Sequence, residues 1–294
     1  MRRTQDVAPI SDVSYVNKIG KLMRYWLPKH VQQDVVAPAL AAFYSQRTDY
    51  HAMTASEDKI EDPQVRLLIQ CIKPKDILVE FGCGGGVVLS RVGCLAKEAT
   101  GIDIADLALH RARSRRGQHR VVKADVTKVP LADNYADITY SFEVLEHVWD
   151  PVAVIREMVR VTKPGGTVFF TTPNGYTMNP HLNLRRAVRA INLVGALAAE
   201  LRLVFSHVLY ENIPPDLDAM LVYPDCDMIT RVRPRKLPEL MKSLGCEVNQ
   251  LETFFFLAAK ADSDLQRRRY DHLQRHWFFR WYGDHILLIA TKRG

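Results

Sequence analysis

The chain has 294 residues, 47% of them hydrophobic and 25% charged, which is the composition of a soluble globular protein. Its five cysteines form no C-x-x-C pair, so neither a disulfide framework nor a zinc knuckle is indicated, and a reducing, cytoplasmic setting fits best. The N-terminus lacks the apolar segment of a secretory signal, and no apolar run is long enough to span a bilayer. The net charge of +7 is compatible with an acidic partner but does not require one.

The chain is expected to consist of a short leading segment and one larger domain. Residues 1–60 are predicted to be an N-terminal helical segment, because their apolar positions are scattered and interrupted by prolines. The main domain is expected over residues 61–294. Its first helix is predicted in PQVRLLIQCI, where Val65, Leu68 and Ile72 recur at helical spacing.

Between about residues 62 and 174, short apolar segments alternate with helical stretches. Five of these segments are predicted to be strands: DILVEFG, EATGIDI, RVVKAD, ADITYS and GTVFFTT. The first is almost wholly apolar, as expected when helices cover both faces of a parallel sheet. The alternation of strand and helix therefore predicts a doubly wound α/β fold.

After this alternating region, residues 175–228 are predicted to be a helical insertion that acts as a cap or lid. Within it, residues 182–209 are rich in helix formers and apolar over a wide face, while Arg185 and Arg189 lie on a polar stripe. Three interpretations of this face stay open. It could pack over the ligand-binding edge of the sheet, face lipid, or form a dimer interface.

The remaining residues are predicted to form a helix and two long strands. The helix covers residues 234–245 and is ended by Gly245, and the strands are CEVNQLETFFFLA and HILLIATKR. Between the strands, residues 262–284 mix arginines with aromatic side chains. Such a segment could bind nucleic acid, lie at a membrane interface, or pack on the sheet as an amphipathic helix, and the last interpretation is favoured.

A glycine-rich turn joins the first predicted strand to the following helix. The strand ends at Glu80 and Phe81, and the helix begins at about Val87. The glycines between them are Gly82, Gly84, Gly85 and Gly86. Glycine allows positive φ angles and lets a ligand approach the backbone closely, and a helix N-terminus offers free N–H groups. A tight connection without a ligand is the alternative interpretation.

Acidic residues end the next two predicted strands. In a doubly wound fold, Asp103 would lie beside the glycine turn, where it can accept hydrogen bonds from both hydroxyls of a ribose. Asp125 ends the third strand, where its carboxylate could accept from an adenine amino group. The alternatives are a helix N-cap for Asp103 and an ordinary turn aspartate for Asp125.

Four segments occur in a specific order and spacing: VEFGCGGG, GIDIADLALHRAR, KADVTKVPLADNYADITYSFEVLEHV and MVRVTKPGGTVFFTTPN. Through them the chain resembles the class I S-adenosylmethionine-dependent methyltransferases, of the type-11 and ubiquinone-biosynthesis O-methyltransferase kind. The resemblance is close over residues 60–175 and topological over 229–293. It implies a mostly parallel, seven-stranded sheet with a C-terminal antiparallel hairpin. An NAD- or FAD-binding Rossmann enzyme is the competitor, but its G-x-G-x-x-G pattern needs glycine where Val87 stands.

The resemblance also implies a binding site for S-adenosyl-L-methionine. The implied contacts are Glu80, Gly82, Cys83, Gly84, Gly86, Asp103, Ile104, Asp125, Val126, Ser141 and Phe142. The glycines would shape the turn under the methionine part, and Glu80 would approach its amino group. Asp103 would hold the ribose, while Asp125 and Val126 would flank the adenine. Ser141 and Phe142 would border the pocket of the methyl donor.

The segment SFEVLEHVWDP follows the fourth predicted strand, at the edge where open α/β sheets bind ligands. Glu143, Glu146 and His147 are spaced i, i+3 and i+4, so they would share one face of a helical turn. Two carboxylates and an imidazole suit a divalent cation such as Mg²⁺, and His147, with Glu143 as second candidate, suits a general base. The alternative is a local Glu146–His147 pair that orders the loop.

Two methyltransferase subfamilies carry a similar E-x-x-E-H string. Ubiquinone-biosynthesis O-methyltransferases have it together with an associated divalent cation. Small-RNA 3′-terminal 2′-O-methyltransferases combine it with a further histidine pair, whereas His181 and His207 of this chain stand alone. The comparison favours the first subfamily.

The sequence thus predicts an enzyme that transfers a methyl group to the oxygen or nitrogen of a small or lipid-like molecule. The alternatives are an RNA or protein methyltransferase and, from another class, a non-catalytic cofactor-binding regulatory or scaffold protein. Nucleic acid is not the expected partner; peripheral membrane contact and a homodimer are further alternatives. Residues 182–209 are expected to line the pocket or entry path of a partly apolar acceptor.

Overall fold

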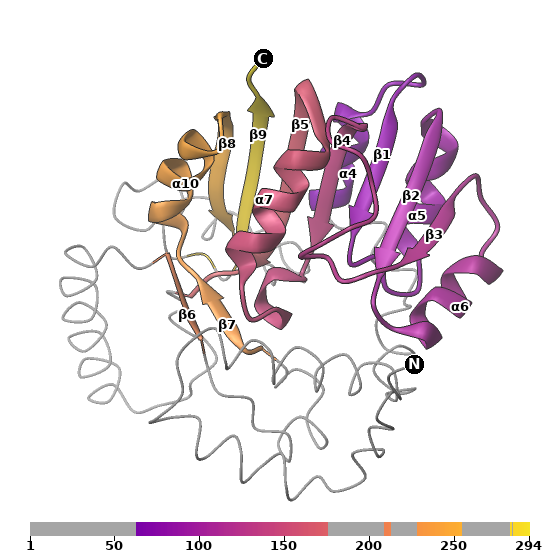
Figure 1. Cartoon of the computed structure of the whole chain (residues 1–294), viewed down its shortest axis with the longest axis horizontal. Helices are drawn as coiled ribbons and strands as arrows, with labels where there is room; N and C mark the ends of the chain where they lie inside the picture. Colours follow the sequence, from indigo (N-terminus) through magenta and orange to yellow (C-terminus); the bar gives the residue numbers. More distant parts are fainter. Residues whose placement is uncertain (1–62, 176–208, 213–227, 255–282, 284) are drawn as a thin grey trace, which may run out of the picture.

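The computed structural model describes residues 63–175, 209–212, 228–254, 283 and 285–294. Within them lies a seven-stranded sheet in the order β3-β2-β1-β4-β5-β9-β8 (Figure 1). Its strands are β1 (Ile77–Phe81), β2 (Glu98–Asp103), β3 (Arg120–Lys123), β4 (Ala136–Phe142), β5 (Thr162–Pro173), β8 (Cys246–Phe254) and β9 (His285–Lys292). The mostly parallel, doubly wound sheet predicted from the sequence is confirmed, and each predicted strand is present.

Helices cover both faces of this sheet. They are α4 (Pro63–Cys71), α5 (Val87–Val92), α6 (Asp106–Ser114), α7 (Pro151–Val161) and α10 (Leu237–Ser243), with 3₁₀ turns η2 (Gly93–Leu95), η3 (Leu145–His147) and η5 (Pro234–Lys236). Helices α7 and α10 pack with one buried cluster, which includes Met158 and Phe170. Helices α4, α5 and α6 pack with a second cluster, which includes Leu68, Leu89 and Tyr140. Burial of β1 on both faces explains its almost wholly apolar sequence.

The C-terminal strands are antiparallel, as the resemblance implied. β9 lies between β5 and β8, with Phe170 opposite Leu288 and Val248 opposite Ala290. The remaining neighbours in the sheet, from β3 through to β5, are parallel. The carboxyl ends of β1, β2, β4 and β5 therefore lie along one edge of the sheet, the lower edge in Figure 1.

The helix boundaries follow from local chemistry. Asp150 is the N-cap of α7, where its carboxylate accepts hydrogen bonds from the amides of Val152 and Ala153, and Pro151 occupies the first turn, which suits its missing N–H. Gly245 follows α10 with a φ of 75°, a conformation that glycine adopts at little cost. The predicted end of this helix at Gly245 is thus confirmed.

Two short strands lie within and just after the predicted helical insertion, residues 175–228. β6 (Tyr210–Asn212) and β7 (Thr230–Val232) pair as an antiparallel ribbon, which the sequence interpretation did not include. Residues 1–60 lie outside the described residues, as do 182–209 and 262–284 except for Leu209 and Gly283, so the proposed domain division stays a prediction. Within the described part of the chain, no helix is long and apolar enough to cross a membrane.

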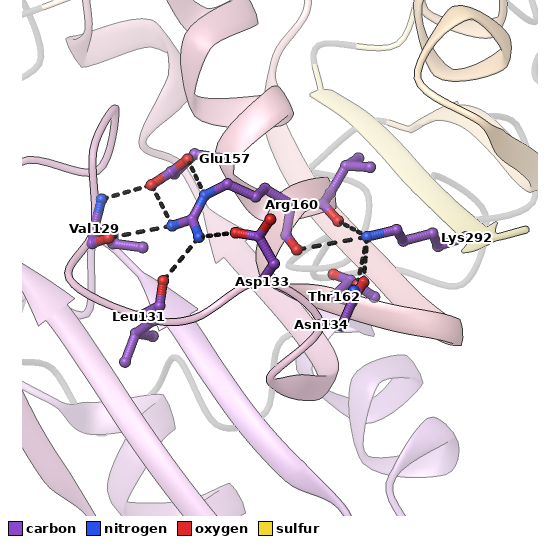
Figure 2. A network of polar contacts seen from close by, with 9 residues as sticks. Val129, Leu131, Asp133, Asn134, Glu157, Arg160, Thr162 and Lys292 are labelled. Atoms are coloured by element: carbon purple, nitrogen blue, oxygen red, sulfur yellow. Dashed lines mark hydrogen bonds and ion pairs between the residues drawn. The ribbon is translucent and has the colours of Figure 1, made fainter. Parts of the chain in front are cut away.

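Two cationic side chains tie α7 to the loop before β4 and to β9 (Figure 2). Arg160 donates to Glu157 and Asp133, and also to the carbonyls of Val129 and Leu131. Lys292, at the end of β9, donates to the carbonyls of Val159 and Thr162, each at 2.8 Å, and to the Asn134 side chain. These contacts satisfy carbonyls that the end of α7 leaves without helical partners.

Replacing Lys292 with methionine is expected to lower the free energy of unfolding by about 1–3 kcal/mol, because several carbonyls lose a charged donor. Urea denaturation measures the change. The neighbouring Arg293→Met is the control, because the exposed Arg293 guanidinium lies 3.6 Å from the exposed Glu247 carboxylate, and the loss of this surface pair should change the free energy of unfolding by less than about 0.5 kcal/mol. Equal effects of the two variants would contradict the capping role.

Candidate cofactor and active site

The glycine-rich turn between β1 and α5 has the backbone that its sequence predicts. Gly82, Gly84 and Gly86 have φ angles of 75°, 51° and 72°, in the left-handed region that favours glycine. The amides of Gly82 and Cys83 donate to the carbonyl of Ile102, at 2.8 and 2.9 Å. These bonds hold the turn against the end of β2.

The surroundings of these glycines differ. A side chain at Gly82 would collide with Val144, and one at Gly86 would approach the Cβ of Ala112 to 2.8 Å. At Gly84, by contrast, an added Cβ would meet no described atom within 4 Å. The turn therefore has one position where the backbone borders open space, and a ligand can approach it there.

Asp103 at the end of β2 is joined directly to this turn. Its Oδ2 accepts a hydrogen bond from the amide of Gly84 at 2.8 Å, and its Oδ1 accepts from the amide of Ala105 at 2.9 Å. The N-cap position of α6 is occupied by Ala105, so the N-cap interpretation of Asp103 is wrong. The carboxylate is fixed beside the open backbone of Gly84, as the ribose-binding prediction requires.

Asp125 lies two residues beyond the end of β3. Its Oδ1 accepts from the amide and from the hydroxyl of Thr127, at 2.8 and 2.7 Å. This is the geometry of a turn aspartate, and it also fixes the direction of the carboxylate. Val126 is buried beside it. Contact of either residue with an adenine stays a prediction.

Glu80 is a buried carboxylate in β1. It accepts a hydrogen bond from the hydroxyl of Tyr140 at 3.1 Å. Burial, together with the charge of Glu80, raises the pKa of Tyr140 well above its ordinary value, so this phenol remains a donor at neutral pH. The pair holds the Glu80 carboxyl group close to the glycine turn, which suits the predicted contact with an amino group.

Cys83 and Ser141 are buried, and Phe142 is half-buried. Burial raises the pKa of Cys83 well above its ordinary value, and the nearby Asp103 adds to this, so the thiol stays protonated. Ser141 is buried and donates its hydroxyl to the carbonyl of Phe81 at 3.0 Å. Phe142 packs edge-on against a phenylalanine of β5. Cofactor contacts of these residues and of Ile104 stay predictions.

The loop after β4 is not the helical turn that the i, i+3, i+4 spacing predicts. Only Leu145–His147 forms a 3₁₀ turn, and Glu143 precedes it with a left-handed φ of 52°. Because Glu143 is outside the turn, Glu143, Glu146 and His147 do not share one helical face, and this part of the prediction is wrong. A positive φ is rare for a residue with a side chain.

Glu143 instead faces β5 and β9. Its Oε1 accepts a hydrogen bond from the hydroxyl of Thr171 at 2.7 Å, and its Oε2 lies 3.3 Å from Nε2 of His285. The His285 ring also packs against Phe254, with ring centroids 5.6 Å apart. The left-handed backbone at Glu143 thus accompanies a side chain directed into a polar cluster at the edge of the sheet.

Glu146 forms a second carboxylate–histidine pair. Its Oε1 lies 3.5 Å from Nε2 of His147, and its Oε2 accepts from the hydroxyl of Thr172 at 3.0 Å. Burial raises the pKa of Glu146 to about 7; His147 opposes the shift, and Glu143 adds to it. The local Glu146–His147 pair, given as an alternative from the sequence, is therefore present.

The structure does not support the predicted metal site at Glu143, Glu146 and His147. Among the described residues, no group of three or more histidine, cysteine, aspartate or glutamate side chains is arranged to hold a metal ion. The reason is visible in the two separate pairs, since each carboxylate is directed to a different histidine and a different threonine.

Sequence reasoning missed Thr171, Thr172 and His285, which complete these two pairs. Both threonines were placed in a predicted strand, but nothing indicated that their hydroxyls would meet the loop after β4. His285 begins the final predicted strand, far from Glu143 in the chain. The one available signal was topological, because a strand that runs antiparallel to β5 begins at the edge where β5 ends.

Comparison with known proteins agrees with this geometry. Residues 79–170 match the family model described as a methyltransferase domain. A protein of Mycobacterium tuberculosis, named as a probable S-adenosylmethionine-dependent methyltransferase, is 34% identical over 39% of this chain and 41% of its own length. The ubiquinone biosynthesis O-methyltransferase of Bordetella pertussis is 38% identical over 33% of this chain and 42% of its own. The chain thus spans about two fifths of the curated relatives it matches.

A solved S-adenosylmethionine-dependent methyltransferase from Mesorhizobium loti superposes with a TM-score of 0.51 at 18% identity, over 81% of this chain and 98% of that protein. This structural similarity establishes the fold of the chain. The sheet order is that of the class I methyltransferase fold, and residues 79–170 match a methyltransferase domain, so the resemblance is confirmed for the fold and for this segment.

Proposed function

We propose that this chain binds S-adenosylmethionine at the carboxyl ends of β1, β2 and β4 and transfers its methyl group to a small or lipid-like molecule. The observation that carries the proposal is the bond from the Gly84 amide to Asp103, beside a backbone position open to a ligand. A fixed carboxylate next to a glycine turn suits the two hydroxyls of a ribose. The resemblance implies that the remaining cofactor contacts lie around this point.

When bound, S-adenosylmethionine supplies a methyl group already activated by its sulfonium. The protein must therefore align the acceptor with that methyl group and exclude water. An acceptor hydroxyl must also lose its proton as its oxygen attacks. His147 is the residue proposed to take this proton, with Glu146 placed to stabilise the resulting imidazolium, and Glu143 is the second candidate.

The nature of the acceptor is supported more weakly. Several relatives are named ubiquinone biosynthesis O-methyltransferases, which supports an oxygen acceptor with apolar character. The apolar composition of residues 182–209 supports the same class and, with it, peripheral contact with a membrane. RNA or protein as acceptor, and a non-catalytic scaffold role, remain alternatives without a structural observation in their favour.

The cofactor site is tested by calorimetric titration of the folded protein with S-adenosylhomocysteine and with NAD. We expect the sulfur compound to bind and NAD not to bind. Asp103→Ala should weaken binding by roughly 1–3 kcal/mol through lost charge-assisted hydrogen bonds. Asp106→Ala is the control, because this exposed carboxylate pairs with Lys123 on the surface and should leave the affinity unchanged.

If neither S-adenosylmethionine nor S-adenosylhomocysteine binds, the proposed function is wrong; if both aspartate variants bind like the wild type, the ribose site is misplaced. The acceptor is identified by incubating the protein with methyl-labelled cofactor and separate lipid, aqueous small-molecule, RNA and protein fractions of a cell extract. We expect label in the lipid or small-molecule fraction. Label confined to RNA or protein would replace the proposed acceptor class.

A further inference from the structure

The β6–β7 ribbon is attached to the sheet where β5 ends. The ribbon pairs Tyr210 with Val232 and Asn212 with Thr230. Val232 also forms an isolated bridge with Asn174, and its carbonyl accepts from the amide of Gly175 at 2.9 Å. Figure 1 shows the ribbon beyond the lower edge of the sheet, the edge that carries the candidate site.

The loop that follows β4 has little structure of its own to hold it. Its 3₁₀ turn lacks a side-chain cap, and one backbone hydrogen bond, from the amide of His147 to the carbonyl of Val144 at 2.9 Å, closes it. The carbonyls of Glu146, Val148 and Trp149 lie outside helix and strand ladders. Backbone carbonyls in such a partly buried segment need partners from elsewhere.

The ribbon supplies those partners. The amide of Ile229 donates to the carbonyl of Glu146 at 2.8 Å, and the buried hydroxyl of Thr230 donates to the carbonyl of Val148 at 2.6 Å. The side-chain amide of Asn212 donates to the carbonyl of Trp149 at 2.7 Å and also to the Thr230 hydroxyl at 3.3 Å. Three carbonyls of the loop are thus held by two residues of the ribbon and by Ile229, which directly precedes β7.

We propose that Thr230 and Asn212 are positioning residues for methyl transfer, because they fix the loop that presents Glu146 and His147 to the acceptor. The inference rests on the proposed function, in which His147 takes the acceptor's proton. Neither residue touches the reacting atoms. Each acts by hydrogen bonds to the loop backbone, so the position of His147 depends on residues far away in the sequence.

The arrangement also links the choice of acceptor to the chemistry. The ribbon lies in the stretch between β5 and α10, and β6 directly follows residues 182–209, which are predicted to line the pocket or entry path of the acceptor. A change in the insertion that shifts β6 or β7 therefore shifts the backbone on which His147 lies. A misplacement of this kind lowers the rate of transfer even when the cofactor binds normally.

The test uses the full chain and three replacements. Thr230→Val removes the hydroxyl but keeps the shape, Thr230→Ser keeps the hydroxyl, and Asn212→Asp removes the amide donor at similar size. Thr291→Val deletes a hydroxyl that bonds Asn249 on another part of the sheet and is the matched control. Hydrogen exchange reports the amides of His147 and Ile229, and calorimetry reports the affinity for S-adenosylhomocysteine.

We expect exchange of these two amides to accelerate about tenfold in Thr230→Val and in Asn212→Asp, and to stay near the wild-type rate in Thr230→Ser and Thr291→Val. Cofactor affinity should change less than about twofold in all four variants. The rate of S-adenosylhomocysteine formation, measured with the active acceptor fraction, should fall in Thr230→Val and recover in Thr230→Ser. If the Thr230 hydroxyl only stabilised the fold, its removal would not slow methyl transfer while leaving the cofactor affinity unchanged.

Unchanged exchange of both amides in Thr230→Val and Asn212→Asp would overturn the proposal. It is also overturned if exchange accelerates while the transfer rate does not move. Should Thr230→Val fail to fold, Asn212→Asp decides, because Asn212 is only partly buried. If the wild-type protein binds no cofactor and methylates nothing, the proposed function fails and the positioning role falls with it, whereas the exchange rates still show whether the ribbon holds the loop.

Discussion

Replacing Gly86 with alanine is expected to lower the free energy of unfolding by about 3 kcal/mol. The new methyl group would enter a left-handed backbone with a φ of 72°, which costs about 1–2 kcal/mol for a residue with a Cβ. It would also lie 2.8 Å from the Cβ and 3.0 Å from the Cα of Ala112, and such overpacking costs about 1–3 kcal/mol. Urea denaturation of the purified variant measures the sum.

Gly84→Ala is the matched comparison, because Gly84 has a φ of 51° but open space around its missing side chain. We expect a stability loss of about 1 kcal/mol from the backbone alone. The methyl group would nevertheless occupy the space assigned to the cofactor, so the affinity for S-adenosylhomocysteine should fall by at least about tenfold. Normal cofactor affinity in Gly84→Ala would place the ligand elsewhere.

Glu146→Gln is expected to change how stability depends on pH. Burial raises the pKa of Glu146 from its ordinary 4.5 to about 7, so between these values the folded protein keeps a proton that the unfolded chain has released. The stability of the wild type therefore falls as pH rises through this window and levels off above it. The loss amounts to up to about 3 kcal/mol, and the glutamine variant, which cannot ionise, should lack it.

Urea denaturation at pH 5 and pH 8 measures this difference. The exposed Glu239 offers a control, since Glu239→Gln removes a surface carboxylate and should leave the wild-type slope unchanged. The sign of the change in stability with pH distinguishes the two cases. A salt-bridged carboxylate with a lowered pKa makes the protein more stable as pH rises, whereas Glu146, with a raised pKa, makes it less stable. Parallel pH profiles of wild type and Glu146→Gln would show that the carboxylate ionises as easily in the folded protein as in the unfolded chain.

The parallel half of the fold could be predicted because its signals are local. β1 is apolar except for Glu80, since both faces of the sheet are covered, and α7 carries its own cap in Asp150 and Pro151. The turn at Gly82 and Gly86 could also be predicted from the sequence, because its left-handed backbone strongly favours glycine. The ribbon was not predicted, since each of its strands is three residues long and its stability comes from partners outside the insertion.

In the candidate site, too, features with a local signal or a place set by strand order could be predicted, whereas contacts between distant segments could not. Asp103 was predicted correctly beside the glycine turn, because its place follows from the order of strands in the sheet. The grouping of Glu143 with Glu146 and His147 was wrong, because it assumed an α-helical turn where the chain forms a 3₁₀ turn after a left-handed residue. Which hydroxyls and imidazoles meet those carboxylates depends on β5 and β9, and no spacing within one segment carries that information.

The position of β9 makes the outer part of the sheet depend on a late segment of the chain. β8 has one neighbour in the sheet, and that neighbour is β9, which in turn pairs with β5. During synthesis, β8 therefore emerges before any strand exists to receive it, and its pairing waits for residues 285–292. A translation product that stops before His285 loses two strands rather than one, leaves the long edge of β5 exposed, and presents a template for aggregation.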